Sequence, residues 1–365
     1  MASPDEAEEE RKLSLIGHRP RHIIDGMIRL TEAEAAAPKP STIHRASPSS
    51  PSMLGTLDTL PLEILHAIFA GLDFKTLLHI SATCLRGIDV VKSLPEYRDL
   101  TSHAPLALAA LGKTRLIRHH TATDLHTALL SPSCTSCNQY GAFLFLPTCQ
   151  RCCYHCLRKN RSFWVIPLSV ARKCFSLSVA EAKSMPKLRS IPGKYSIGYY
   201  VSRQKSIGLV SVSHAKELSI KIHGSQERMR LDLEAQRSSL SILDFHTFRV
   251  LQQAPLVPPG LDLSIQPMES NVPNDRYCGM ASVPFPHLRS DRQVEHGLWC
   301  LGCEALGRNW SANGPIPEQL AHLLLPGCRA DNVVDSRQDI ARSRAELLRH
   351  IDQCPEARSL VHAGR

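Results

Sequence analysis

Paired cysteines place the tightest constraint on what this chain can fold into. Cys134 and Cys137 form one C-x2-C pair, and Cys153 and Cys156 form another after fifteen intervening residues. This spacing is typical of a four-cysteine zinc site, because zinc prefers four soft ligands arranged as a tetrahedron. The sequence therefore predicts two cysteine turns that face each other across a short hairpin and hold a structural zinc ion.

The second pair of ligands has an alternative. Cys149 and Cys152 also form a C-x2-C pair, and pairing them with the first one leaves only eleven intervening residues. That spacing is shorter than usual for zinc but possible. We expect Cys153 and Cys156 to be the ligands, with Cys149 and Cys152 as alternates.

A second set of candidate ligands lies far along the chain. Cys300 and Cys303 form a C-x2-C pair in LWCLGCE, and His350 and Cys354 are four residues apart on a predicted helix. Residues at this helical spacing share a face, so the four side chains are predicted to form a Cys3His zinc site. The alternative is that they lie apart and act as small buried side chains. That second role is assigned to the remaining cysteines, Cys84, Cys174, Cys278 and Cys328.

Neither site suggests catalysis. Four protein ligands leave no open position at which a metal could activate water, so both sites are predicted to be structural. The sequence contains no phosphate-binding glycine loop, no H-E-x-x-H and no G-x-S-x-G. The chain is therefore not expected to be an enzyme.

Composition indicates the cellular compartment in which the chain is expected to fold. Hydrophobic residues make up 43% of the 365 residues and charged residues 21%, which is ordinary for a globular protein. The N-terminus is acidic without a following apolar stretch, and no apolar run approaches the roughly 18 residues that a membrane span needs. We expect an intracellular protein of the cytoplasm or nucleus, with no membrane contact and with thiols rather than disulfides.

Residues 57–100 carry the clearest helical pattern. Pro61 can occupy a first turn, and apolar residues then recur at three- and four-residue spacing to line one face. Asp73 is a suitable N-cap for a second helix, and a third is predicted near Arg86–Ser93. Three short helices bury too little surface to be stable alone, so this unit needs a partner or a neighbouring domain.

Further elements are predicted around this unit. A capping arrangement at Ser336 and Asp339 is expected to begin a final helix that carries Ile340, Leu347, Leu348 and Ile351 and ends at Pro355. The other expected elements are helices at Pro105–Leu111, Ala122–Leu130 and Leu168–Phe175, strands at Ala142–Leu146 and Ile207–Val212, and a loop at Lys187–Tyr200.

The stretch LDTLPLEILHAIFAGLDFKTLLHISATCLRGIDVVKSLPEYRDL resembles an F-box. The matching features are Leu60-Pro61, Glu63-Ile64-Leu65, Ile68-Phe69, Leu72, Leu77-Leu78, Thr83-Cys84, Pro95 and Tyr97. Together with the paired-cysteine block LPTCQRCCYHCL, the segment over residues 57–200 is similar to a fungal F-box family. The resemblance implies that the box binds a Skp-type adaptor and, through it, a cullin–RING ubiquitin ligase.

The resemblance also implies which residues do this. An apolar face that a small helical unit cannot bury internally is a helix-in-groove docking surface. The rest of the chain would recruit an unknown protein client or fold around the box. The residues expected to contact the adaptor are Leu60, Pro61, Leu65, Ile68, Leu72 and Leu77.

The predicted fold class is mainly α with small β elements, in which a three-helix F-box precedes a zinc-stabilised, loop-rich α+β region. The expected divisions are a disordered tail (1–53), the F-box (54–100), helices with the cysteine block (101–223), a poorly defined region (224–292) and a C-terminal cysteine pair with a helix (293–365).

Two rival functions remain. The net charge of +9 and the basic tract Arg158–Arg161 beside a cysteine pair would suit a nucleic-acid-binding zinc protein. Few aromatic residues accompany the basic clusters, so we expect solvated surface there and no nucleic-acid partner. The other rival is an F-box protein that acts outside a ligase.

Overall fold

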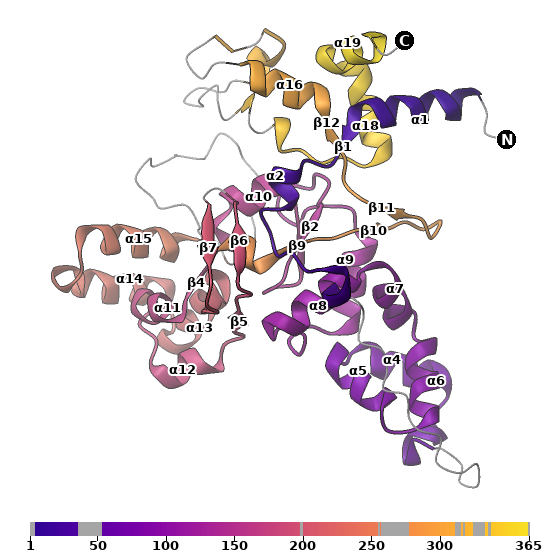
Figure 1. The fold of residues 1–365 in the computed structure, drawn as a ribbon. Helices are drawn as coiled ribbons and strands as arrows, with labels where there is room; N and C mark the ends of the chain where they lie inside the picture. The colour runs from indigo at the N-terminus through magenta and orange to yellow at the C-terminus, as the bar shows by residue number, and fades with distance from the viewer. Residues whose placement is uncertain are drawn as a thin grey trace.

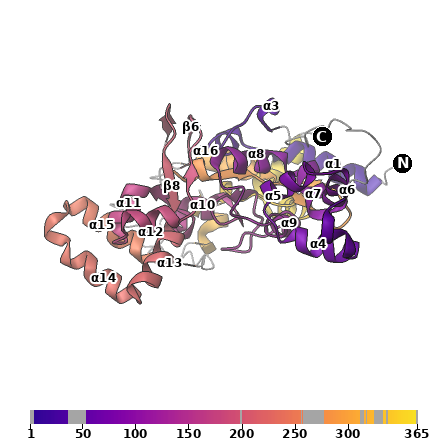
Figure 2. The same cartoon turned by 90° about the horizontal axis from the view of Figure 1, so that it is seen from below.

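The structure is a computed structural model that describes residues 4–35, 53–197, 200–254, 256, 277–310, 315–316, 318–323, 333–334 and 337–363. It is mainly helical with several small antiparallel sheets, as the sequence predicts. None of the described helices is long and apolar enough to cross a membrane. In both views, residues 57–100 lie at one end of the molecule and a helical lobe within residues 164–254 lies at another (Figures 1 and 2).

The N-terminal segment is folded, so the predicted disordered tail is wrong for residues 4–35. Its apolar side chains, including Leu13, Ile16 and Met27, are buried against segments distant in sequence. A composition rich in Glu and Ala cannot reveal such partners. Residues 36–52 lie outside the described part. The elements are α1 (Pro4–Ile16), β1 (Gly17–His18), α2 (Arg21–Ile24) and α3 (Glu32–Ala35).

The three predicted helices of the box unit are present. Asp73 caps the second helix as predicted, because its Oδ1 accepts a hydrogen bond from the Thr76 amide at 3.0 Å. The buried face of the unit joins the main core, in which Phe74 stacks on Tyr97 at 5.1 Å between ring centroids. The elements are η1 (Gly55–Thr59), α4 (Leu62–Ala70), α5 (Phe74–Ser81), α6 (Leu85–Ser93) and α7 (Pro95–His103).

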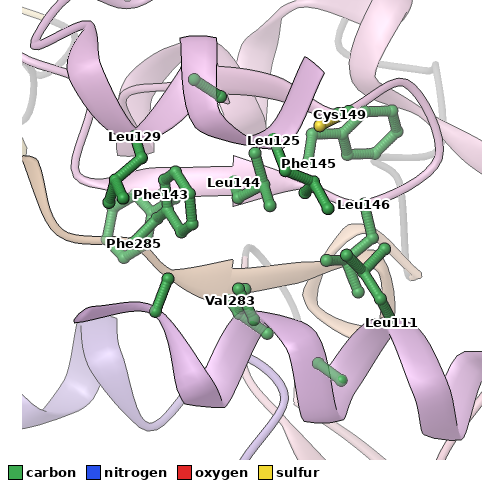
Figure 3. Close-up of a cluster of buried hydrophobic side chains, with 14 of the residues drawn as sticks. Leu111, Leu125, Leu129, Phe143, Leu144, Phe145, Leu146, Cys149, Val283 and Phe285 are labelled. Carbon is green, nitrogen blue, oxygen red and sulfur yellow. The ribbon is translucent and has the colours of Figure 1, made fainter. Parts of the chain in front are cut away.

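The main core is built around a three-stranded antiparallel sheet in the order β3-β2-β9. Figure 3 shows apolar side chains of β2 and β9, among them Phe143 and Val283, packed between Leu111 of helix α8 and Leu129 of helix α9. The predicted strand and both predicted helices are therefore confirmed. The elements are α8 (Pro105–Thr114), α9 (Ala122–Leu130), β2 (Phe143–Phe145), β3 (Gln150–Cys152), α10 (Tyr154–Lys159), η4 (Cys278–Ala281) and β9 (Ser282–Pro284).

A second core lies in the helical lobe and crosses the predicted division at residue 223. Its buried residues run from Trp164 to Ala254, so residues 224–254 are largely helical rather than poorly defined; residues 257–276 of that predicted region lie outside the described part. The predicted loop at 187–200 also contains strands. The first elements are η2 (Arg161–Phe163), β4 (Val165–Pro167), α11 (Leu168–Cys174), α12 (Val179–Ser184), β5 (Leu188–Arg189) and β6 (Gly193–Tyr195). Those that follow are β7 (Val201–Arg203), β8 (Gly208–Ser211), α13 (Val212–His223), α14 (Gln226–Ala235), η3 (Arg237–Ser239) and α15 (Ile242–Gln253).

The C-terminal region joins the N-terminus. Helix α1 packs against α18 and α19, and β1 pairs with β12 (Figure 1). Helix α18 begins later than predicted, because Ser343 and Glu346 form its capping box; Ile340 precedes it and Ser336 lies outside the described residues. The elements are β10 (His287–Leu288), β11 (Val294–Glu295), β12 (Trp299–Cys300), α16 (Leu301–Asn309), η5 (Glu318–Leu323), α18 (Arg344–Gln353) and α19 (Pro355–Ala363).

Candidate metal centres and the exposed helical face

The structure brings Cys134, Cys137, Cys153 and Cys156 together in one cluster, here called the central tetrad. Their sulfur atoms all lie within 4.8 Å of one another. The Sγ atoms of Cys137 and Cys153 are 3.6 Å apart. Two sulfurs bound to one tetrahedral zinc would be separated by about 3.8 Å, given Zn–S bonds of about 2.3 Å. The spacing of the cluster thus fits a four-coordinate metal ion.

Turns at both cysteine pairs position these ligands. In the first turn, the amide of Cys134 donates to the Gln139 carbonyl at 2.7 Å, and Asn138 takes a positive φ of 60°. In the second, Cys153 is the N-cap of α10, and its sulfur accepts from the Cys156 amide at 3.3 Å. Backbone amides directed at a sulfur stabilise the thiolate form, which is the form that binds metals.

Electrostatics support the same interpretation. Hydrogen bonds from the neighbouring thiols of Cys137, Cys153 and Cys156 lower the pKa of Cys134 well below its usual range. The hydrogen bonds with Cys134 raise the pKa of Cys153 and Cys156 above the usual value, so Cys134 gives up its proton most easily while those two thiols retain theirs. A metal cation would replace the remaining protons, because thiolates bind it as they deprotonate.

The alternates, Cys149 and Cys152, lie outside the central tetrad. Cys152 stands on β3 opposite Phe143, and burial raises its pKa well above the usual value. Burial also raises the pKa of Cys149. Because neighbouring residues of a strand point to opposite faces, a ligand at Cys153 directs Cys152 away from the site. Both alternates behave as buried neutral thiols.

Cys300, Cys303, His350 and Cys354 form a second cluster, the terminal tetrad. All four are buried, and their ligand atoms lie within 4.8 Å of one another. The Sγ of Cys303 is 3.2 Å from Nε2 of His350. The two widely separated pairs of the sequence therefore converge on one Cys3His site.

Three elements build the terminal tetrad. Cys300 ends β12 and begins α16, His350 lies in the last turn of α18, and Cys354 is the C-cap of that helix. Gly302 lets α19 approach closely, because a Cβ there would lie 2.5 Å from the backbone nitrogen of Ala357. The thiols of Cys303 and Cys354 donate hydrogen bonds that lower the pKa of Cys300 to about 3.

Sequence reasoning missed the N-terminal contribution to this site. Strand β1 pairs with β12 so that Gly17 is opposite the ligand Cys300. Nε2 of His18 also lies 2.9 Å from Oε2 of Glu304, the residue after Cys303. Leu13 and Ile16, three residues apart in an otherwise charged segment, were the available signal for a helix with one buried face.

The six residues expected to contact an adaptor differ in how far their side chains are exposed to solvent. Pro61 is exposed and Ile68 is 43% exposed, whereas Leu60 and Leu72 are half-buried against the main core. Leu65 and Leu77 are fully buried, so their inclusion in a contact surface is wrong for this structure. They point inward because the side of α4 and α5 that carries them packs on α6 and the main core.

The exposed side of the unit is nevertheless apolar. Leu62, Ile64 and Ile68 on α4 are 39%, 48% and 43% exposed, and Leu85 at the start of α6 is 47% exposed. We call these four exposed residues the apolar face; within it, the four-residue spacing of Ile64 and Ile68 puts both on the same side of α4. The amide of Ala122 donates to the Leu72 carbonyl at 2.9 Å and fixes the unit to α9.

The basic tract at residues 158–161 is not a free surface. Arg158 forms an ion pair with Asp339 at 2.8 Å and lies over the ring of Tyr154. Its neighbouring aromatic residues, Phe163 and Trp164, are buried in the two cores. This tract therefore holds the fold together and offers no rings for stacking.

Compared with known proteins, the chain matches no family model, no curated protein and no solved structure.

Proposed function

We propose that this chain is an F-box adaptor that docks a Skp-type adaptor of a cullin–RING ubiquitin ligase through residues 57–100. The observation that carries the proposal is the apolar face. A short helical unit anchored on one side, with isoleucine and leucine side chains exposed on the other, suits burial in a partner's groove. Because residues 57–100 are fixed to the rest of the chain, a protein client bound there would be held at a defined position relative to the ligase.

We also propose that both tetrads hold zinc. Soft thiolate and imidazole ligands in a closed set of four favour zinc, and leave no coordination position for catalysis. The chain would then be a non-enzymatic receptor, in which zinc stabilises the region that binds a protein client. Elemental analysis of the purified chain is expected to give two zinc ions per molecule.

Capture of a purified Skp-type adaptor by the full chain tests the docking proposal. Replacing both Ile64 and Ile68 by alanine removes two large side chains from the apolar face. Each can cost about 2 kcal/mol at the centre of an interface, so capture should weaken at least a hundredfold. A matched control replaces Ile222 and Ile242, which are 40% and 81% exposed in the helical lobe.

The control variant should capture the adaptor as the unchanged chain does. If the Ile64/Ile68 variant captures it equally well while remaining folded by circular dichroism, the apolar face is not the docking surface. If the unchanged chain captures no adaptor at all, the F-box proposal fails, while the zinc measurement stands independently.

A further inference from the structure

The basic charge of the chain is concentrated in one stretch. Residues 182–216 contain seven lysines and arginines and no aspartate or glutamate. The bounding acid on one side, Glu181, is occupied as a helix cap, because its carboxylate accepts from the Ser178 amide at 2.7 Å. One of the seven cations, Lys216, is buried and donates to the Ala254 carbonyl. The others remain on or near the surface.

The middle of this stretch contains a two-stranded ribbon. Strands β6 and β7 pair with Lys194 opposite Ser202 and Tyr195 opposite Val201. Both views show the ribbon standing out from the helical lobe (Figures 1 and 2). A projecting ribbon presents one whole face of side chains to a partner.

The two faces of the ribbon differ sharply. Because side chains alternate along a strand, every second residue shares a face. The inner face packs on the body: Tyr195 is buried and its hydroxyl donates to the Ile191 carbonyl at 2.6 Å, while Arg203 lies over the Tyr277 ring at 5.7 Å. The outer residues are all exposed; they are Pro192, Lys194, Ser196, Tyr200, Ser202 and Gln204.

Two further exposed cations stand at the base of the ribbon. Arg189 is on β5, and Lys205 follows β7. The base is fixed, because Ser206 Oγ donates to the Ser190 carbonyl at 2.7 Å and the Ile207 amide donates to Ser190 Oγ at 2.9 Å. The base of the ribbon, which carries these two cations, is therefore held in a fixed geometry.

In contrast to the expectation from the sequence that the chain has no nucleic-acid partner, we infer that the outer face of the β6–β7 ribbon, with Arg189, Lys194, Tyr200 and Lys205, binds single-stranded nucleic acid. Lysine and arginine neutralise phosphates, while serine and glutamine donate hydrogen bonds to the backbone. Tyr200 is 66% exposed and offers a ring on which a base can stack.

The chemistry of the outer face favours this ligand over an acidic protein. Protein interfaces need buried apolar anchors. The described outer face exposes Tyr200 but no leucine, isoleucine, valine or phenylalanine; the adjacent Ile191 and Val201 are half-buried, and Leu188 and Ile197 are buried. The surface is also separate from residues 57–100, so the inference does not depend on the adaptor proposal.

Fluorescence anisotropy with the full chain tests the inference. The probes are labelled twenty-nucleotide single strands of uridine RNA and thymidine DNA, a DNA duplex of equal length, and a polyglutamate chain of equal charge. The first variant carries Arg189→Gln, Lys194→Gln and Lys205→Gln. A control with equal charge loss carries Arg21→Gln, Arg349→Gln and Arg358→Gln, at exposed sites outside the helical lobe.

Both unchanged chain and control should bind a single strand with strong salt dependence. The ribbon variant should lower the slope of log affinity against log salt by about 2, since each lost phosphate contact is worth about 0.7 for single strands. Tyr200→Ala should weaken binding about tenfold or more, and Tyr200→Phe should restore it.

A higher affinity for the RNA or for the DNA single strand would show which of the two nucleic acids the ribbon binds. Three results would overturn the inference: no binding of either single strand at low salt, equal loss in the ribbon and control variants, or polyglutamate binding as tight as that of the single strands. Far-UV circular dichroism and the thermal unfolding temperature of the same variants should match those of the unchanged chain, which confirms that they are folded.

Discussion

The central and terminal tetrads share their chemistry but differ in what they join. The central ligands lie within 23 consecutive residues, on two turns of one hairpin. In the terminal tetrad, Cys303 and His350 are 47 positions apart, and the N-terminal strand completes the surroundings. A bound metal ion would therefore stabilise a local hairpin in the central tetrad and would hold both ends of the chain together in the terminal tetrad.

Their surroundings differ as well. The central tetrad belongs to the main core, where Phe143 and Tyr154 pack beside it. The terminal core consists of nine buried residues in the described chain, and three of them are the ligands Cys300, Cys303 and Cys354. A small core contributes little stability without its metal. Loss of metal from the central tetrad should therefore unfold the main core. Loss of metal from the terminal tetrad should only loosen the packing of the terminal helices on the rest of the protein.

The largest effect is expected from Cys153→Ser in the central tetrad. Structural zinc contributes roughly 10 kcal/mol or more, which is comparable with the whole stability of a domain. The variant should lose one zinc and its cooperative thermal unfolding transition. Cys152→Ala is the matched control, because it removes a buried sulfur that is not a ligand. If both variants unfold at the same temperature, the central tetrad does not hold a structural metal.

A smaller and local effect is expected from His350→Ala. Without this ligand the terminal zinc should be lost, and amide hydrogen exchange should rise in α1, α18 and α19, while the main core stays protected. Mass spectrometry of exchanged peptides measures this. His362→Ala, at an exposed histidine of α19, should change neither zinc content nor exchange. A global rise in exchange would mean that the two sites do not differ as we propose.

The same contrast explains what the sequence could predict. The central ligands followed from spacing alone, because two pairs on one hairpin are also close in space. For the terminal site, the geometry of one helix predicted only that His350 and Cys354 share a face; whether they meet Cys300 and Cys303 was left open by the sequence. Both predictions depended on local rules that act over a few residues.

What the sequence could not predict depends on distant contacts. Helix α1 looked like an acidic tail because its partners, α18 and α19, are more than three hundred residues away. Leu65 and Leu77 were assigned to a docking surface, because an apolar stripe does not say which of its sides meets the protein's own core. Tertiary packing decides both questions.

Ile16→Ala distinguishes the contribution of apolar packing by α1 from the contribution of the metal to the stability of the terminal site. Ile16 is fully buried in the terminal core, and removing its side chain should cost about 2–4 kcal/mol. Exchange should rise in α1 alone, with two zinc ions retained. Ser14→Ala, an exposed change on the same helix, is the control. Loss of zinc from the Ile16 variant would contradict the expectation that the terminal tetrad binds metal without the packing of α1, and would show that α1 is needed for the metal site.

The smallest change in stability is expected at a hydrogen bond that joins the C-terminal region to helix α7 without a metal ion. The buried carboxylate of Asp99 on α7 accepts a hydrogen bond from Arg292, between β10 and β11, at 2.8 Å. This hydrogen bond is the main reason why the pKa of Asp99 is lowered. A lowered pKa stabilises the fold above pH of about 4, and that stability is lost as the pH falls further.

Asp99→Asn should therefore lower the free energy of unfolding by about 2 kcal/mol at pH 7. The loss should become progressively smaller below pH of about 4, where the Asp99 carboxyl of the unfolded chain takes up a proton while the folded one is still ionised. Denaturant unfolding at several pH values measures the difference. Asp291→Asn, in the exposed ion pair with Arg289, is the control and should cost less than 1 kcal/mol, roughly the value of a surface pair. A pH-independent loss at Asp99 would show that its packing, and not its charge, joins the two regions. The zinc content should stay at two, which would separate this polar link from both tetrads.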